Sequence, residues 1–221
     1  GKGHEKIQEY KKIKTLFSDQ EQILKNITLK NKSLSNNVKL NILKELSNSK
    51  NISSKLKIKN ASINSKEVKK NDIFFAIKGK NKDGNLFIKE AFAGGASLAI
   101  ANDKKKSKKK IIVKNTLKFL TEASSIIREN SSSKIIAITG SCGKTSLKEL
   151  TGRLLNKVSQ ATYSPKSFNN KYGVPLSVFN LRKNDNFGIF EVGMDKKGEI
   201  DYLSKIIKPD VGVITNISYA H

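Results

Sequence analysis

The sequence feature that most constrains the fold is the stretch 134–156, KIIAITGSCGKTSLKELTGRLLN, where an apolar run leads into a glycine-framed turn and a helix-like segment. The run 135–138 is typical of a buried parallel strand, although by itself it also fits a buried helical turn. Gly140 and Gly143 let the backbone turn sharply, so that successive N–H groups can converge on one anion. The stretch therefore predicts a strand, a phosphate-binding loop and a helix, in that order.

The two residues after the second glycine supply the side chains that such a loop needs. Lys144 places a cation beside bound phosphates, and Thr145 offers a hydroxyl to Mg²⁺. The general P-loop pattern has a longer spacing between its glycines, whereas Ser141 and Cys142 alone separate them here. The alternative interpretation is an ordinary strand-turn-helix corner that contains Gly-Lys-Thr.

Strand-like and helix-like segments alternate along much of the chain, which predicts an α/β fold with mostly parallel strands and flanking helices. We expect a small N-terminal α/β domain at 38–115 and a truncated P-loop-type central domain at 116–221, after a tail at 1–30 and a linker at 31–37. In the helix after the loop, we expect one apolar face made of Leu147, Leu150, Leu154 and Leu155. The expected strands are 73–77, 98–101, 111–113, 161–163, 187–192 and 211–215, and the expected helices include 38–48, 86–92, 116–130 and 198–207.

Two residues near the ends of expected strands are candidates for the same site. In open parallel sheets, ligands bind beyond the carboxyl ends of the strands. Glu191 lies at such an end, and His221 lies a few residues beyond another. A carboxylate suits Mg²⁺ well, whereas histidine is a less usual ligand for it. A solvent-exposed carboxylate and a lone histidine remain the alternative interpretations.

Composition limits the class of protein. A chain of 221 residues with 37% hydrophobic content can form one or two domains with real cores. Its apolar runs are far shorter than the roughly 20 residues that cross a bilayer, and its single cysteine suits a reducing compartment. We therefore expect a cytoplasmic protein, and we expect it to be a monomer.

The formal charge of +24 raises the possibility of nucleic-acid binding. The excess comes from lysines spread along the chain, with one dense block at 104–110, and the sequence contains no RNA-binding signature. We therefore expect no nucleic-acid partner, and we keep salt-dependent binding to DNA or RNA as a rival hypothesis.

Four stretches resemble the Mur ligase family, and in particular its D-alanyl-D-alanine-adding members. They are TGSCGKTSLKE, FNN-x-x-GVP, EVGM-x-x-x-GEI and PDVGVITNIS-x-AH, matching in order and spacing over roughly residues 40–221. The short loop is the family's own form, and the resemblance implies that Gly140 to Ser146 hold the phosphates of ATP. Cys142 and Ser146 stand where Asn and Thr are usual, and neither change removes a backbone donor.

The resemblance implies a reaction and its catalytic residues. ATP would phosphorylate the terminal carboxylate of UDP-N-acetylmuramoyl-tripeptide, and the amine of D-alanyl-D-alanine would then attack the acyl phosphate. Lys144, Glu191 and His221 would serve this chemistry, with Thr145, Glu191 and His221 as metal ligands. ATP and Mg²⁺ are the implied cofactors.

The resemblance also implies substrate contacts. Asn169 and Asn170 match a family stretch near the substrate peptide. Asn64, Ser65 and Lys66 fall where the family commonly has Asp-Ser-Arg, which implies that Ser65 and Lys66 bind the UDP-sugar. Lysine offers a point charge in place of the arginine fork, which weakens this analogy.

The resemblance extends to the start of the chain. The stretch 1–30, with its GKGHE and FSD motifs, resembles the C-terminal end of the diaminopimelate-adding Mur ligase, where Gly1 and Glu5 would contact an amino acid. We expect the chain to be a fragment that lacks the C-terminal ligase domain and is inactive alone. Another Mur-type or folylpolyglutamate-type ligase and a catalytically dead nucleotide-binding module remain alternatives.

Overall fold

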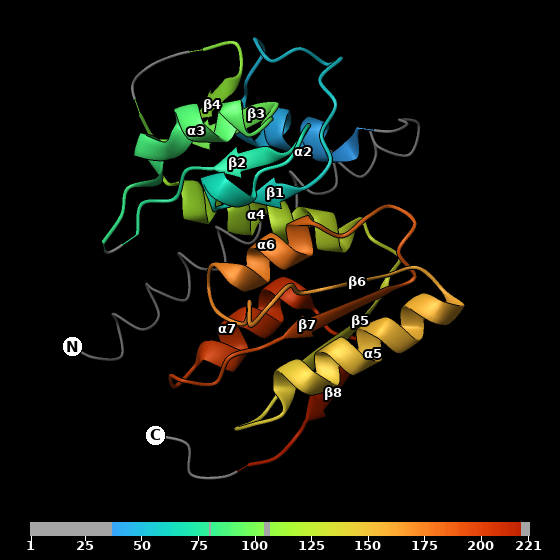
Figure 1. Ribbon diagram of the computed structural model, residues 1–221. Helices are drawn as coiled ribbons and strands as arrows, with labels where there is room; N and C mark the ends of the chain where they lie inside the picture. The colour runs from blue at the N-terminus through green and yellow to red at the C-terminus, as the bar shows by residue number, and fades with distance from the viewer. Residues whose placement is uncertain (1–36, 80, 104–106, 218–221) are drawn as a thin grey trace, which may run out of the picture. The chain divides into compact units, whose positions relative to one another are not determined.

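A computed structural model describes residues 37–79, 81–103 and 107–217 (Figure 1). The tail at 1–30 and His221, with the roles expected for them, lie outside the described residues. Two four-stranded sheets carry this part of the chain, and every pair of neighbouring strands in them is parallel. The predicted α/β class with parallel sheets and flanking helices is therefore confirmed.

The first sheet has the order β1-β2-β3-β4. The sequence analysis did not predict β1. This strand has only two residues, too few for a sequence pattern, and it is defined by the pairing of Ala61 with Ile73. A buried cluster around Phe74, Ala91 and Ala99 packs the sheet against its helices. The elements are α2 (Val38–Ser47), β1 (Ala61–Ser62), η1 (Ser65–Glu67), β2 (Ile73–Phe75), η2 (Gly84–Phe87), α3 (Ile88–Ala93), β3 (Leu98–Ala101) and β4 (Lys110–Ile112).

The second sheet has the order β6-β7-β5-β8. Its strands are parallel, so a crossover that contains a helix connects each strand to the next one along the chain. The strands and helices predicted for this region all form, with bounds close to those expected. None of the helices in the described part of the chain has the length and apolar character needed to cross a membrane. The elements are α4 (Thr116–Glu129), β5 (Lys134–Thr139), α5 (Lys144–Val158), β6 (Ala161–Tyr163), α6 (Gly173–Phe179), β7 (Phe187–Glu191), α7 (Glu199–Ile207) and β8 (Val211–Ile214).

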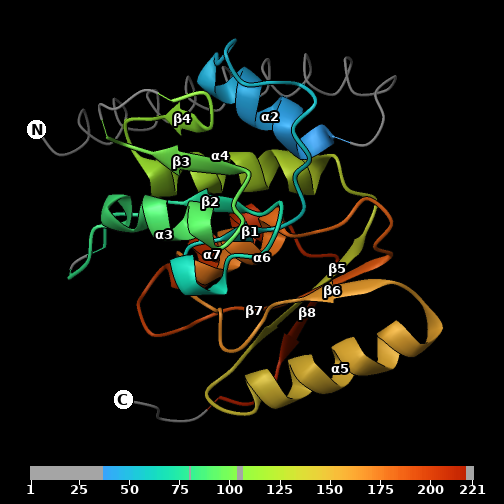
Figure 2. The ribbon, with the colours of Figure 1, turned by 45° about the horizontal axis from the view of Figure 1, so that its top comes forward.

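Helices α4, α6 and α7 lie between the two sheets, and α5 covers the other face of the second sheet (Figure 2). The side-chain amide of Asn180, after α6, accepts from the Ala61 N–H at 2.6 Å and donates to its carbonyl at 3.0 Å. The Phe75 and Phe179 rings meet edge to face at 5.3 Å. Since α4 contacts both β2 and α6, the domain boundary expected between 115 and 116 stays a prediction.

The expected apolar face of α5 is wrong in part. Leu150 and Leu154 are more than half exposed, whereas Lys148 and Gly152 are buried against the sheet. Gly152 permits this orientation, because a Cβ there would lie 2.4 Å from the Tyr163 ring. Leu147 and Leu155 do pack against the buried cluster of the sheet, so the spacing of the leucines predicted the helix correctly and only part of its packed face.

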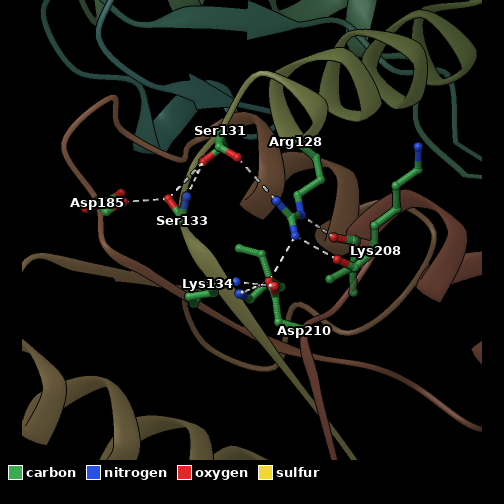
Figure 3. Close-up of polar contacts among 9 residues, drawn as sticks. Arg128, Ser131, Ser133, Lys134, Asp185, Lys208 and Asp210 are labelled. Atoms are coloured by element: carbon green, nitrogen blue, oxygen red, sulfur yellow. Dashed lines mark hydrogen bonds and ion pairs between the residues drawn. The ribbon is translucent and has the colours of Figure 1, made fainter. Parts of the chain in front are cut away.

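A polar network closes the end of the second sheet where β5 and β8 begin (Figure 3). Asp210 accepts hydrogen bonds from the Ile135 amide at 2.8 Å and from Arg128 and Lys134 at 3.1 Å each. Arg128 also donates to the carbonyls at Ile207 and Lys208, at the end of α7. The network ties α4 and α7 to the sheet at the end opposite the glycine loop, which is residues 140–143.

Candidate functional site

The glycine loop begins beside the carboxyl end of a neighbouring strand. Strands β5 and β7 are adjacent, and Ile138 pairs with Glu191 in their register. The helices that follow these strands, α5 and α7, lie on opposite faces of the sheet (Figure 1). Such a switch point is where open parallel sheets bind ligands. The topology therefore places the loop and Glu191 at one candidate site.

The loop has the backbone conformation that its glycines predict. Gly140 has φ of 135° and Gly143 has φ of 78°, both positive, and Gly143 is the N-cap of α5. A Cβ on Gly140 would lie 2.1 Å from Thr215 Oγ1. The ammonium of Lys144 donates to the Gly140 carbonyl at 2.5 Å. The lysine therefore folds back over the loop, at the start of the helix.

The Glu191 carboxylate is buried and held by neutral donors. It is 1% exposed, and its Oε2 accepts from the Thr145 hydroxyl at 2.8 Å. Its Oε1 accepts from the Asn169 side-chain amide at 3.0 Å, and its own N–H donates to Ser164 Oγ at 3.1 Å. The candidate metal ligands Thr145 and Glu191 therefore lie in direct contact.

This oxygen pair suits Mg²⁺. Ligands about 2.0–2.1 Å from an octahedral ion lie about 2.9 Å from their neighbours, close to the 2.8 Å between Thr145 Oγ1 and Glu191 Oε2. Within the ranges that the structure describes, no group of three His, Cys, Asp or Glu side chains could hold a metal. Among the described residues, Thr145 and Glu191 are thus the candidate ligands, and phosphate and water would add to them as Mg²⁺ usually requires. His221, the third predicted ligand, lies outside the described residues.

Two amides of the glycine loop donate hydrogen bonds to Asn216, a residue that the sequence analysis did not select as a site residue. The amides of Ser141 and Cys142 donate to the backbone and side-chain oxygens of Asn216, at 3.1 and 3.0 Å. The Thr215 hydroxyl donates to the Cys142 carbonyl at 2.5 Å. The adjacency of β8 and β5 brings this Thr-Asn pair to the loop, and that adjacency is not visible in the sequence. The first N–H groups of α5, which have no acceptor within a helix, complete the candidate phosphate site.

The candidate substrate residues have structural partners of their own. Asn170 Oδ1 accepts from the amides of Tyr172 and Gly173, at the start of α6. Ser65 is buried and donates to Glu90 Oε2 at 2.6 Å, whereas Lys66 is exposed. Substrate binding by Ser65, Lys66, Asn169 and Asn170 stays a prediction.

An ion pair links the neighbourhood of Ser65 to the second sheet. Lys166, in the segment between β6 and α6, donates to Glu67 Oε1 at 2.7 Å. This hydrogen bond is the main cause that lowers the pKa of the Glu67 carboxyl below its ordinary value. Glu67 lies in η1 together with Ser65 and Lys66, so this ion pair joins the turn that holds the candidate sugar residues to the segment between β6 and α6.

Family models match both parts of this arrangement. The model described as "Mur ligase family, catalytic domain" matches residues 57–136, and "Mur ligase middle domain" matches residues 138–221. The chain belongs to the Mur ligase family. The predicted family is thus confirmed, and the glycine loop, Glu191 and Asn216 lie in the part matched by the middle-domain model.

Several curated proteins similar to this chain carry the name UDP-N-acetylmuramoyl-tripeptide–D-alanyl-D-alanine ligase. The protein from Rickettsia prowazekii is 40% identical over 176 residues, which cover 77% of this chain and 38% of the relative. The protein from Buchnera aphidicola (subsp. Baizongia pistaciae) is 38% identical over 152 residues, which cover 67% of this chain and 33% of the relative. The chain thus spans about a third of the length of these relatives.

Solved structures of MurF give the same result for the Mur ligase fold. MurF from Acinetobacter baumannii is 32% identical with a TM-score of 0.70, over 82% of this chain and 41% of that one. MurF from Thermotoga maritima in complex with ADP is 35% identical with a TM-score of 0.62, over 76% of this chain and 40% of that one. A similar fold thus binds an adenine nucleotide in the second of these proteins.

Proposed function

We propose that this chain is the nucleotide- and UDP-sugar-binding part of an ATP-dependent ligase of peptidoglycan precursor synthesis, acting in the cytoplasm. The ligase would join D-alanyl-D-alanine to UDP-N-acetylmuramoyl-tripeptide. The γ-phosphoryl group of ATP passes to the terminal carboxylate of the tripeptide and ADP leaves. The amine of D-alanyl-D-alanine then attacks the acyl carbon, and phosphate leaves as the amide forms. The shared name of the similar proteins supports the choice of these two substrates.

The observation that carries the proposal is the contact between Thr145 and Glu191 beside the glycine loop. Phosphoryl transfer depends mainly on positioning and on charge neutralisation. The loop supplies both, because the Lys144 ammonium and the first amides of α5 are fixed at one end of the sheet. These groups would hold the β- and γ-phosphates of ATP.

Each residue of the site has a distinct task in this proposal. Thr145 and Glu191 would hold Mg²⁺, which when bound neutralises charge on the phosphates. Asn169 orients the carboxylate through its hydrogen bond to Oε1. Gly140 keeps space for the loop against Thr215, and Lys144 moves from the Gly140 carbonyl to a phosphate oxygen.

The nucleotide part of the proposal is tested by calorimetric titration of the chain with ADP, with Mg²⁺ and with EDTA. We expect Mg²⁺-dependent binding that Lys144→Ala abolishes, while Lys157→Ala, on the exposed end of α5, leaves it unchanged. Equal binding by wild type and Lys144→Ala would contradict the proposed site. Binding to DNA or RNA that falls steeply with salt, with no ADP binding, would favour the nucleic-acid hypothesis.

The acceptor is tested by a ligation assay on the protein as its gene encodes it. We expect amide formation with UDP-N-acetylmuramoyl-tripeptide and D-alanyl-D-alanine, and none with L-glutamate or diaminopimelate as the amine. Ligation of one of those amino acids would indicate a different Mur-type ligase. ADP binding without ligation of any amine would favour the module without catalysis.

A further inference from the structure

The side chain of Lys148 is fully buried, although lysine is a residue that proteins rarely bury. It lies on α5, one turn beyond Lys144, and faces the sheet rather than solvent. Its ammonium donates to the Lys166 carbonyl and lies 3.1 Å from Glu149 Oε1. Burying an ammonium costs free energy unless the group is paired, so these two contacts explain why the fold tolerates the buried Lys148 side chain. They do not account for why a lysine is placed there.

The acceptor of Lys148 belongs to a segment with an unusual backbone. Lys166 has φ of 51°, in the left-handed region that residues with a side chain seldom occupy. Such a conformation persists where the surroundings over-determine it. Here the carbonyl is held by Lys148, and the ammonium of Lys166 is held by Glu67.

The same segment, residues 164–170, delivers side chains to the candidate metal site. Asn169 holds Glu191 Oε1, and its carbonyl accepts from the Gly193 amide at 2.6 Å. Ser167 Oγ lies 3.5 Å from Thr145 Oγ1. Lys148 and Thr145 lie on one helix, so the hydrogen bond from Lys148 to the Lys166 carbonyl joins the helix of Thr145 to the segment of Asn169.

We propose that Lys148 is a positioning residue, which fixes the 164–170 segment so that Asn169 orients Glu191 toward Thr145. It acts through Asn169 and does not touch the nucleotide or the metal. The Lys166–Glu67 pair extends this connection to η1, where Ser65 and Lys66 lie. The proposal rests on the proposed function, because it specifies how the nucleotide site is kept in shape.

The first test uses Lys148→Met, which keeps the length of the side chain and removes its donor, with Lys157→Met as the matched control on α5. ADP affinity is measured with Mg²⁺ and with EDTA. We expect Lys148→Met to weaken Mg²⁺-dependent ADP binding about 10-fold, within the range for residues that orient metal ligands, and to leave binding in EDTA nearly unchanged. A lowered melting temperature with unchanged Mg²⁺ dependence would overturn the proposal.

A double-mutant cycle with Asn169→Ala tests whether Lys148 acts through that residue. We expect Lys148→Met to have no further effect on Mg²⁺-dependent binding in the Asn169→Ala background. Additive losses would overturn the proposed route through Asn169. If Lys148→Met does not fold, Lys148→Gln, which retains a donor, takes its place in both measurements, with a smaller expected loss.

Hydrogen exchange of the ligand-free chain separates failure of this proposal from failure of the proposed function. We expect peptides covering residues 164–173 to exchange several-fold faster in Lys148→Met than in wild type, with β5 unchanged. Unchanged exchange in 164–173 would overturn the positioning role whether or not the chain binds ADP. A wild type that binds no ADP, with faster exchange in the variant, would contradict the proposed function alone.

Discussion

The Thr145 hydroxyl donates a 2.8 Å hydrogen bond to Glu191, a residue 46 positions further along the chain. Two adjacent parallel strands create this contact, since Thr145 follows β5 and Glu191 ends β7. An acidic group is thereby held next to the hydroxyl that follows the glycine loop, which is the arrangement that Mg²⁺-nucleotide chemistry needs.

The charge of Glu191 should determine the dependence of nucleotide binding on Mg²⁺. Glu191→Gln keeps the shape of the side chain and removes its charge. We expect Mg²⁺ to strengthen ADP binding at least about 10-fold in the wild type, worth about 1.4 kcal/mol, and less than about 2-fold in the variant. Titration calorimetry measures this, with Glu122→Gln on α4 as the control. An equal effect of Mg²⁺ on ADP binding in the wild type and in Glu191→Gln would exclude Glu191 as a metal ligand.

Gly140→Ala should disrupt the loop for two reasons. A Cβ would lie 2.1 Å from Thr215 Oγ1, and φ of 135° is strained for alanine. We expect a loss of about 1–3 kcal/mol in the free energy of unfolding and loss of ADP binding. Gly212→Ala in β8 is the matched control, since the added carbon would have no heavy atom of another described residue within 4 Å, its chain neighbours apart. Equal free energies of unfolding for Gly140→Ala and Gly212→Ala in urea would contradict this explanation.

Gly152→Ala should destabilise the protein even though alanine is the better helix former. The helix gains about 1 kcal/mol of propensity, while a Cβ placed 2.4 Å from the Tyr163 ring costs about 1–3 kcal/mol of overpacking. In a Tyr163→Ala background the same change should become stabilising. Urea unfolding of the four proteins tests this, and a stabilising effect in the wild-type background would contradict it.

The sequence could predict the strand, loop and helix at 134–156, because apolar runs and glycines determine local structure. It predicted only part of the face of α5 that packs, because the fit of the small Gly152 against the Tyr163 ring, which lies on β6, decides that face. Asn216 was missed for a related reason. Its role depends on β8 lying beside β5, and strand order is set by tertiary packing.

Asp210 should make stability depend on acid pH. Hydrogen bonds from the Ile135 amide and Lys134, together with the nearby Arg128, lower the pKa of its carboxyl (Figure 3). Because the folded-state pKa is lowered, Asp210 stabilises the fold above its unfolded pKa of about 3.9, and this contribution is lost as the pH falls through the folded-state pKa. Asp210→Asn should unfold at lower urea concentration near neutral pH and lose less stability on acidification. The same acid dependence in wild type and variant would contradict this.

Cys142 offers a chemical test of the loop, since it is the one cysteine of the chain and is exposed. Its sulfur accepts from the Asn216 side-chain amide at 3.0 Å, and its amide donates to the same residue. We expect N-ethylmaleimide to abolish ADP binding by disrupting the loop, and Mg²⁺-ADP to slow the modification. Cys142→Ser should bind ADP and resist the reagent. Full ADP binding by the alkylated protein would contradict this placement of the loop.

The most direct measurement of the central claim is a crystal structure of the chain with Mg²⁺ and ADP. The account predicts an ion about 2.0–2.1 Å from both Thr145 Oγ1 and a Glu191 carboxylate oxygen, with the β-phosphate at the first amides of α5. An ion held by phosphate and water alone, with Glu191 still bonded to Thr145, would contradict it.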